Sequence, residues 1–176
     1  SVLIATFNME NYVCEAIDSS LNSLDDCEVV IVDDGSTDRT FELLKEKYIN
    51  EDRVVLHKFD QNRGKVAAFN MAYFLSKGEV LTLLGADDHM LPGRQAAVDY
   101  MLENERVDLV LGSYFKADKY MNNKKRMIIK SREWSQILQK NSYPGGAMVI
   151  KRNLAECVFP IPESLKNEDY LIALCA

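Results

Sequence analysis

The chain has few of the side chains that most often build metal centres and nucleophile sites. Its 176 residues include only four cysteines and two histidines. The cysteines are scattered, without the close spacing of a zinc site, and each lies in or beside an apolar segment. We therefore expect free, buried thiols in a reducing compartment. These residues are Cys14, Cys27, Cys157 and Cys175.

Long apolar runs and several binding motifs are also missing. No run approaches the roughly 20 residues of a membrane-spanning helix, so we expect no span, and no signal peptide precedes the first apolar segment. There is no glycine-rich dinucleotide fingerprint and no phosphate-binding loop with its lysine. The net charge of −6 argues against a nucleic-acid binder, which needs a broad basic surface. An anionic ligand would therefore need a metal ion to supply most of the compensating charge.

The first part of the chain alternates apolar strands with helices. Strands are predicted at 1–5, 29–32, 54–59 and 81–84, with helices between them and a further helix from about Pro92 to Asn104. Regular alternation of this kind predicts right-handed crossovers and an α/β fold with a doubly wound, mostly parallel sheet. The length suits one domain, residues 1–176, with one core.

The second part of the chain is less regular. We predict a strand at 108–115, a polar, basic excursion at 116–126, a short strand at 127–129 and a helix that begins at Ser131 and carries Trp134. A strand at 147–150 and a last helix opened by Asn167 follow. Residues 1 to about 115 therefore form a nucleotide-type half, and about 116–176 a mixed half for a second substrate. The chain has no initiator methionine and stops within the last helix, so we expect a fragment of a longer protein.

Two predicted strands end in a pair of aspartates, Asp33-Asp34 and Asp87-Asp88. If the sheet is parallel, both pairs lie at the same edge, just beyond the carboxyl ends of the strands, where such sheets bind ligands. Adjacent like charges repel unless a cation or a hydrogen-bonding ligand holds them. Mg²⁺ and Mn²⁺ prefer oxygen ligands and often link carboxylates to phosphates. The alternative is that each pair is a solvated turn that caps the next helix.

Other polar residues near these turns have plainer interpretations. Asn8 is either the cap of the first helix or a ligand-binding residue, and Ser36 or Thr37 can cap the second helix. His57 lies in an apolar strand and is expected to be structural. His89 directly follows the second acid pair and is a weaker candidate for contact with substrate.

Five segments of the chain resemble, in order, the family 2 glycosyltransferases, inverting enzymes with the GT-A fold. The resemblance implies a Rossmann-like sheet flanked by helices and a reaction that moves a sugar from a nucleotide-diphosphate sugar, first of all a UDP-sugar, to a hydroxyl group. It implies a glycan or lipid-linked acceptor, a role in polysaccharide or other glycan synthesis, and a cytoplasmic location that includes the inner face of the membrane. The segments are Ser1–Asn8, Val32–Asp38, Asn62–Asn70, Gly85–Asp88 and Asn167–Tyr170.

The resemblance also implies roles for single residues. Phe7 would stack on the base, and Asp34 would read its edge. Asp88, with Asp87, would ligate Mn²⁺ or Mg²⁺, and Asp169 would act as general base on the acceptor. The nucleotide-binding residues would be Thr6, Phe7, Asn8, Asp34, Arg63, Lys65 and Asp87, and the acceptor side would hold Gly145, Gly146, Glu168 and His89.

Two positions depart from the family pattern, and three other protein classes compete with it. Gly85 replaces the first acid of the usual Asp-x-Asp-Asp run, and Ala5 replaces a proline. A receiver domain is a poor alternative, because its acid pair follows the first strand. A sugar-1-phosphate nucleotidyltransferase would carry a glycine-rich, basic loop after strand one, which is absent here. A GT-A-like domain that binds a nucleotide sugar without catalysis stays open.

Overall fold

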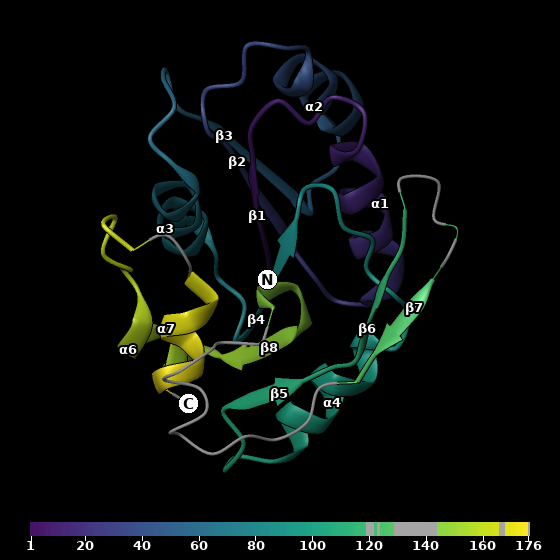
Figure 1. Cartoon of the computed structure of the whole chain (residues 1–176), viewed down its shortest axis with the longest axis vertical. Helices are drawn as coiled ribbons and strands as arrows, with labels where there is room; N and C mark the ends of the chain where they lie inside the picture. Colours follow the sequence, from purple (N-terminus) through teal and green to yellow (C-terminus); the bar gives the residue numbers. More distant parts are fainter. Residues whose placement is uncertain (119–121, 123, 129–143, 166–167, 176) are drawn as a thin grey trace.

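The core of the protein is a six-stranded sheet (Figure 1). The computed structural model describes residues 1–118, 122, 124–128, 144–165 and 168–175. The strand order is β3-β2-β1-β4-β8-β5; β1 to β4 are parallel, and β8 pairs antiparallel with both β4 and β5. The strands are β1 (Val2–Thr6), β2 (Val29–Asp33), β3 (Val54–Lys58), β4 (Val80–Gly85), β5 (Leu109–Leu111) and β8 (Met148–Lys151).

Helices cover both faces of this sheet because the buried side chains of each strand alternate between the faces. In β1, Val2 and Ile4 pack into one apolar cluster and Leu3 into the other. The first face carries α1 (Val13–Ser23), α2 (Thr40–Tyr48) and α4 (Arg94–Glu103); the second carries α3 (Lys65–Leu75), α6 (Arg152–Val158) and α7 (Glu168–Cys175) (Figure 1).

The order of the parallel strands creates one point where the sheet reverses its direction of growth. From β1 the chain builds outward to β2 and β3, and it then crosses back through α3 to place β4 on the other side of β1. The crossover from β1 to β2 runs through α1 on the first face, whereas the crossover from β3 to β4 runs through α3 on the second face, so a crevice is expected beyond the carboxyl ends of β1 and β4. Ligands of open α/β sheets bind at such switch points. The mostly parallel, doubly wound architecture predicted from the sequence is therefore confirmed.

The second half differs from the prediction in three places. The strand predicted at 108–115 is wrong, because β5 ends at Leu111, where the Gly112 amide donates to the carbonyl of Ala147 and closes the pairing with β8. A separate two-stranded sheet follows, β6 (Tyr114–Lys116) with β7 (Lys125–Met127), so the second short strand begins two residues earlier than predicted. Helix α6 was not predicted. The predicted helix at Ser131 with Trp134 lies outside the described residues.

Predicted helix starts also need correction. Asn8 does not cap α1, which begins at Val13, and neither Ser36 nor Thr37 caps α2, which begins at Thr40. Pro92 precedes α4, whose first residue is Arg94. The turns after β1 and β2 extend several residues beyond the predicted caps. In these two turns the polar groups form hydrogen bonds with each other.

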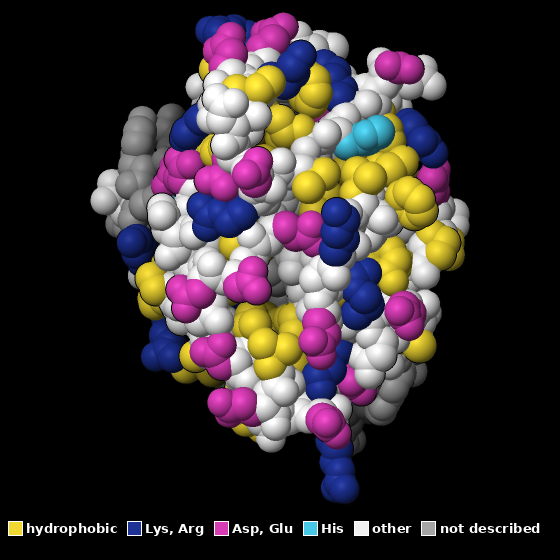
Figure 2. Space-filling view, turned by 180° about the vertical axis from the view of Figure 1, so that it is seen from behind, with side chains coloured by type: hydrophobic (Ala, Val, Ile, Leu, Met, Phe, Trp, Pro, Cys, Tyr) yellow, Lys and Arg dark blue, Asp and Glu magenta, His cyan; other side chains and the backbone are white. Residues whose placement is uncertain are grey.

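The cysteines are free, as expected, but not all are buried. Cys27 is buried and Cys14 half-buried, whereas Cys157 and Cys175 are exposed. The prediction of buried thiols is therefore wrong for the latter two. Among the described residues, no helix has the length and apolar character needed to cross a membrane. Basic and acidic side chains are interspersed over the face shown in Figure 2, without a large area of one sign.

Candidate active site

A cavity of about 560 Å³ opens at the carboxyl ends of β1 and β4, where the topology predicts a ligand site. It gathers segments from the whole chain: the ends of β1, β2 and β4, the start of α3, the turn before β8 and the start of α7. Asn8, Arg63 and His89 do not line it. The predicted site residues that do are Thr6, Phe7, Asp34, Lys65, Asp87, Asp88, Gly145, Gly146 and Asp169.

Asp34 holds the loop that leads into α3. Its side chain is buried, and its two oxygens accept hydrogen bonds from the backbone amides of Arg63 (2.7 Å) and Gly64 (2.9 Å). Gly64 has a φ of +96°, a backbone conformation that suits glycine and turns both amides toward the carboxylate. Asp34 therefore fixes one wall of the cavity, and its predicted contact with a base stays a prediction.

Asp33, the first acid of the pair at the end of β2, is fully buried and does not line the cavity. Its side chain has no exposed surface; Oδ1 accepts from the amide of Ser36 (2.8 Å), and Oδ2 lies 3.8 Å from Lys58 Nζ. Lys58 also donates to the Ser36 carbonyl (3.1 Å). Asp33 and Lys58 are the last residues of the neighbouring parallel strands β2 and β3 and are paired in register. An acid and a base at the ends of two predicted strands were the sequence signal for this ion pair. Within the described residues, Asp33 Oδ2 and the buried hydroxyl of Thr6 have no hydrogen-bond partner.

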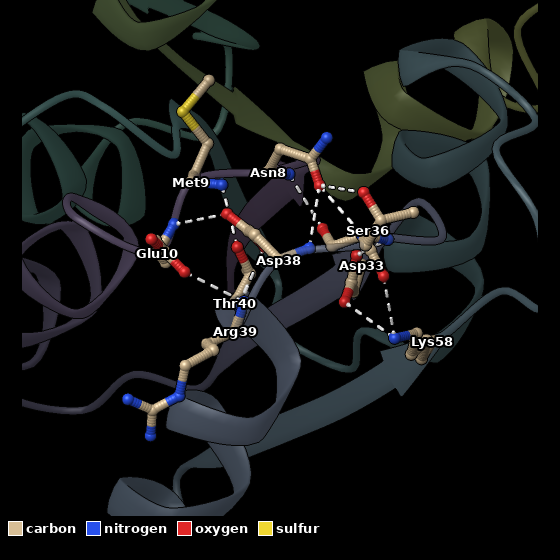
Figure 3. Close-up of polar contacts among 10 residues, drawn as sticks. Asn8, Met9, Glu10, Asp33, Ser36, Asp38, Arg39, Thr40 and Lys58 are labelled. Carbon is tan, nitrogen blue, oxygen red and sulfur yellow. Dashed lines mark hydrogen bonds and ion pairs between the residues drawn. The ribbon is translucent and has the colours of Figure 1, made fainter.

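Asn8 braces the loop after β1 against the loop after β2 (Figure 3). Its amide donates to Ser36 Oγ (2.9 Å), and its side-chain oxygen accepts from the Thr37 amide (2.9 Å) and the Asp38 amide (3.4 Å). Asn8 adopts a φ of +53°, which asparagine tolerates better than most residues. The Asn8 side chain thus accepts hydrogen bonds from backbone amides, as a helix cap would. These amides belong to the turn after β2, not to the helix α1 that follows Asn8.

Asp38 completes this brace (Figure 3). Its carboxylate accepts from the amides of Thr40 (2.9 Å) and Glu10 (3.3 Å), while Met9 donates to Thr40 Oγ1 (2.8 Å). Burial alone would raise the pKa of Asp38, but the hydrogen bonds from Thr40 and Glu10 together lower it below its usual value. Asp38 is half-buried, and its carboxylate accepts a hydrogen bond from the amide of Thr40, the first residue of α2.

The second acid pair has a very different environment. A Cβ atom placed on Gly85 would lie 2.7 Å from Asp88 Oδ2 and 3.1 Å from Asp87 Oδ1, so both carboxylates bend over this glycine. Partial burial in the cavity, followed by the charge of Asp87, raises the pKa of Asp88. A side chain at Gly85, where the family pattern has an acid, would require the carboxylate of Asp88 to move from its present position.

The pair has the chemistry of a site for a hard divalent cation. Two carboxylate oxygens converge on one point, and their mutual repulsion would be relieved by a positive charge. No group of three or more His, Cys, Asp or Glu residues suited to a metal occurs in the described part of the chain. Two carboxylates supplemented by the phosphates of a ligand are a usual coordination for Mg²⁺, so the residues present fit such an ion.

The turn before β8 brings the far end of the chain to this pair. Gly145 begins a short 3₁₀ turn, Gly145–Ala147, and a Cβ atom on Gly145 would lie 3.7 Å from Asp169 Cβ and 3.8 Å from Leu83 Cβ. A Cβ on Gly146 would lie 3.3 Å from Asp88 Oδ2. Asp169 and Asp88 therefore line one cavity, and the glycines of the same turn border both of them.

Three predicted residues lie elsewhere, or beyond what is described. The Arg63 guanidinium lies over the Phe59 ring (4.7 Å to the ring centre) and 3.4 Å from Glu163. His89 Nδ1 lies 3.3 Å from Glu15 of α1. The side chain of Glu168, the first residue of α7, is outside the described part of the structure.

Comparison with known proteins gives a consistent result. The family model described as "Glycosyl transferase family 2" matches residues 1–159. An uncharacterised glycosyltransferase of Haemophilus influenzae is 28% identical over 178 residues, which cover 99% of this chain and 70% of that protein. A chondroitin synthase of Escherichia coli is 33% identical over 135 residues, which cover 76% of this chain and 19% of that protein.

Solved structures agree with the sequence comparison. The crystal structure of S. aureus TarS 1–349 in complex with UDP matches with a TM-score of 0.74 and 27% identity, over 97% of this chain and 52% of that one. This chain therefore spans about half the length of that crystallised chain. The resemblance found in the five sequence segments is confirmed, and so is the GT-A fold. The chain belongs to glycosyl transferase family 2 and is a glycosyltransferase domain.

Proposed function

We propose that the chain transfers a sugar, with inversion, from a nucleotide-diphosphate sugar to a hydroxyl group of a glycan or lipid-linked acceptor. The observation that carries this proposal is that one cavity is lined by Asp88 at the end of β4 and by Asp169 of α7. Inversion by direct displacement needs two things: a stabilised leaving group and a base on the opposite side of the sugar. The cavity offers a candidate residue for each.

The donor half of the cavity supports a nucleoside diphosphate as ligand. Phe7 is 40% exposed at the mouth of the cavity, so its ring is available for stacking on a base. Lys65 lines the cavity at the first turn of α3, where a helix N-terminus also favours an anion. TarS, a relative by structure, was crystallised with UDP and with UDP-GlcNAc, which makes a UDP-sugar the first donor to test.

Asp87 and Asp88 would hold the divalent cation, Mn²⁺ or Mg²⁺. Bound there, the ion would act as a Lewis acid that neutralises charge on the diphosphate. Asp169 would accept the proton of the acceptor hydroxyl as its oxygen bonds to the anomeric carbon. The bond from that carbon to the diphosphate breaks in the same step, and the nucleoside diphosphate leaves. No nucleophile from the protein is needed.

Two alternatives make different predictions. A binding-only domain would bind UDP or UDP-GlcNAc with Mn²⁺ but transfer nothing. A sugar-1-phosphate nucleotidyltransferase would need a basic, glycine-rich loop after β1, whereas residues 7–12 contain neither glycine nor a basic residue.

The location at the inner face of the cell membrane also stays a proposal. The exposed basic residues Lys116, Lys125 and Arg126 of the β6–β7 hairpin are the part of the surface that would suit an anionic lipid.

The test is to measure donor binding and transfer separately in Asp169→Asn. We expect its affinity for UDP-GlcNAc with Mn²⁺, measured by calorimetry, to stay within about threefold of wild type. Transfer to an acceptor that wild type uses should fall by about 10²–10⁴-fold, the range typical for a lost general base. Glu156→Gln, on the exposed side of α6, is the control and should change neither quantity. Near wild-type transfer by Asp169→Asn would remove this residue from the mechanism, and binding without transfer by wild type would favour the binding-only domain.

A further inference from the structure

Arg94, the first residue of α4, donates hydrogen bonds to the segment Gly146–Met148. This segment lies between Asp88 on one side of the cavity and Asp169 on the other. Arg94 Nη2 donates to the carbonyl of Gly146, and its Nη1 donates to the carbonyl of Met148 (3.4 Å). Both carbonyls belong to the segment that holds the glycine turn and the start of β8. The guanidinium therefore reaches from the segment after the acid pair to the segment beside Asp169.

An arginine is poorly suited to this position on other grounds. A positive charge at a helix N-terminus opposes the helix dipole. Burial lowers the pKa of Arg94, which shows that the charged form is partly stripped of water. No carboxylate pairs with it among the described residues. A neutral residue at this position would avoid the free-energy cost of partly burying a charge. What arginine adds in return is its two hydrogen bonds to the backbone carbonyls.

Other hydrogen bonds fix the neighbours of Gly146 in this turn. Thr82 of β4 donates its hydroxyl to the Met148 carbonyl (2.8 Å), and the Gly112 amide donates to the Ala147 carbonyl (2.8 Å). Gly146 has only Arg94 as a side-chain donor to its carbonyl among the described residues. A Cβ atom on Gly146 would lie 3.3 Å from Asp88 Oδ2, so Gly146 borders this carboxylate and a shift of its backbone changes the space beside the acid pair.

We propose that Arg94 is a positioning residue that sets the distance between the donor side of the cavity, at Asp88, and the acceptor side, at Gly145 and Asp169. The proposal rests on the proposed transfer reaction. Arg94 touches no reacting atom; it acts through the backbone of the glycine turn. Displacing a reacting group by about 1 Å is enough to cost roughly 10²-fold in rate, so a loosened turn should slow transfer without removing any donor contact.

Arg94→Met and Arg94→Lys test this role, with Arg106→Met as the matched control. Methionine donates no hydrogen bond, whereas lysine keeps the charge and N–H donors but lacks the planar fork by which two nitrogens of arginine each reach one carbonyl. Arg106 is exposed, and no hydrogen bond or ion pair of its side chain occurs within the described residues. Each variant is assayed for UDP-GlcNAc affinity with Mn²⁺, for kcat and for KM toward the acceptor used with wild type, and for Tm.

We expect Arg94→Met to lower kcat by at least tenfold, with donor affinity within about threefold of wild type. Arg94→Lys should recover part of the loss, and Arg106→Met should match wild type. Loss of kcat and donor affinity together, in proportion to a lowered Tm, would mean that Arg94 only supports the fold and would overturn the proposal. So would a wild-type kcat in Arg94→Met. A wild-type protein without transfer activity would instead contradict the proposed function.

Thr82→Val gives a second test if Arg94→Met does not fold. It removes the other side-chain donor to the Met148 carbonyl and keeps the shape of the buried side chain. A smaller fall in kcat at unchanged donor affinity supports the positioning role of the turn. An unchanged kcat would show that the turn does not need to be held, and the proposal would fail.

Discussion

The two Asp-Asp pairs have the same sequence and the same place in the fold, yet their environments are opposite. Asp33 and Asp34 follow β2, are 0% and 3% exposed, and accept hydrogen bonds from backbone amides. Asp87 and Asp88 follow β4, are exposed on the cavity side and crowd each other over Gly85. Both acids of the first pair accept backbone hydrogen bonds, and Lys58 lies 3.8 Å from the remaining oxygen of Asp33, whereas the second pair lacks a partner of opposite charge among the described residues.

This difference separates what builds the cavity from what would hold a ligand. An acid whose oxygens accept backbone hydrogen bonds stabilises a loop at any ligand concentration. An acid whose ionised form is disfavoured by a like charge gains most when a cation arrives. Position after a parallel strand is therefore not enough to assign a role, and the partners of each carboxylate decide it.

Removing Asp34 should have the largest effect, and the effect should be on stability. Asp34→Ala leaves the amides of Arg63 and Gly64 without their acceptor, and each orphaned buried donor costs roughly 1–3 kcal/mol. We expect the free energy of unfolding to fall by about 2–4 kcal/mol, measured by urea denaturation. The control is Asp60→Ala, an exposed acid near the same loop, which should cost less than about 0.5 kcal/mol. Equal losses for the two variants would show that Asp34 is not structural.

Asp88→Asn should reverse this pattern, because it should affect binding rather than stability. Disturbing even the residues around a metal's ligands costs about 10–100-fold in affinity, so we expect a loss of about 100-fold or more in Mn²⁺-dependent binding of UDP. The melting temperature should not fall, since removing one of two repelling charges relieves strain in the absence of the ion. Asp60→Asn is again the control. If the two variants titrate alike with Mn²⁺, the second pair does not hold the metal.

Much of the fold could be predicted because it depends on local pattern. Continuous apolar runs such as Val29–Val32 identified the parallel strands, and strand ends placed both acid pairs at one edge. The interval from Asp108 to Phe115 was misread as one strand because its break depends on a bond from Gly112 to Ala147, which is far away in the sequence. Pattern within one segment carries no information about that partner.

The site was less predictable for the same reason. That Asp34 is structural depends on Arg63 and Gly64, and that Arg94 matters depends on Gly146, 52 residues later. Asn8 was read as a cap for its own helix because caps are local, whereas its partners Thr37 and Asp38 lie in the next turn. The sequence could therefore name the residue types at the edge of the sheet but not which of them are already engaged.

The smallest expected effect concerns Asp38, which belongs to the structural side of the comparison. Its folded-state pKa lies below the ordinary value, so its ionised form stabilises the fold at neutral pH. That contribution is fully present above the unfolded-state pKa of about 3.9 and is lost as the pH falls through the lower folded-state value. Asp38→Asn should therefore be less stable than wild type at pH 7, by less than Asp34→Ala, and the gap should narrow below about pH 4.

Urea denaturation of both proteins at several pH values between 7 and 3 would measure this gap, with the exposed Asp52→Asn as the control. Only the difference between variant and wild type is informative, because other carboxylates also titrate in this range. A gap that narrows for Asp38→Asn and stays near zero for Asp52→Asn would place Asp38 with the first pair, as a carboxylate held by backbone amides. A gap that stays constant with pH would mean that the charge of Asp38 does not contribute, and that the brace between the two loops depends on the hydrogen bonds of Asn8 instead.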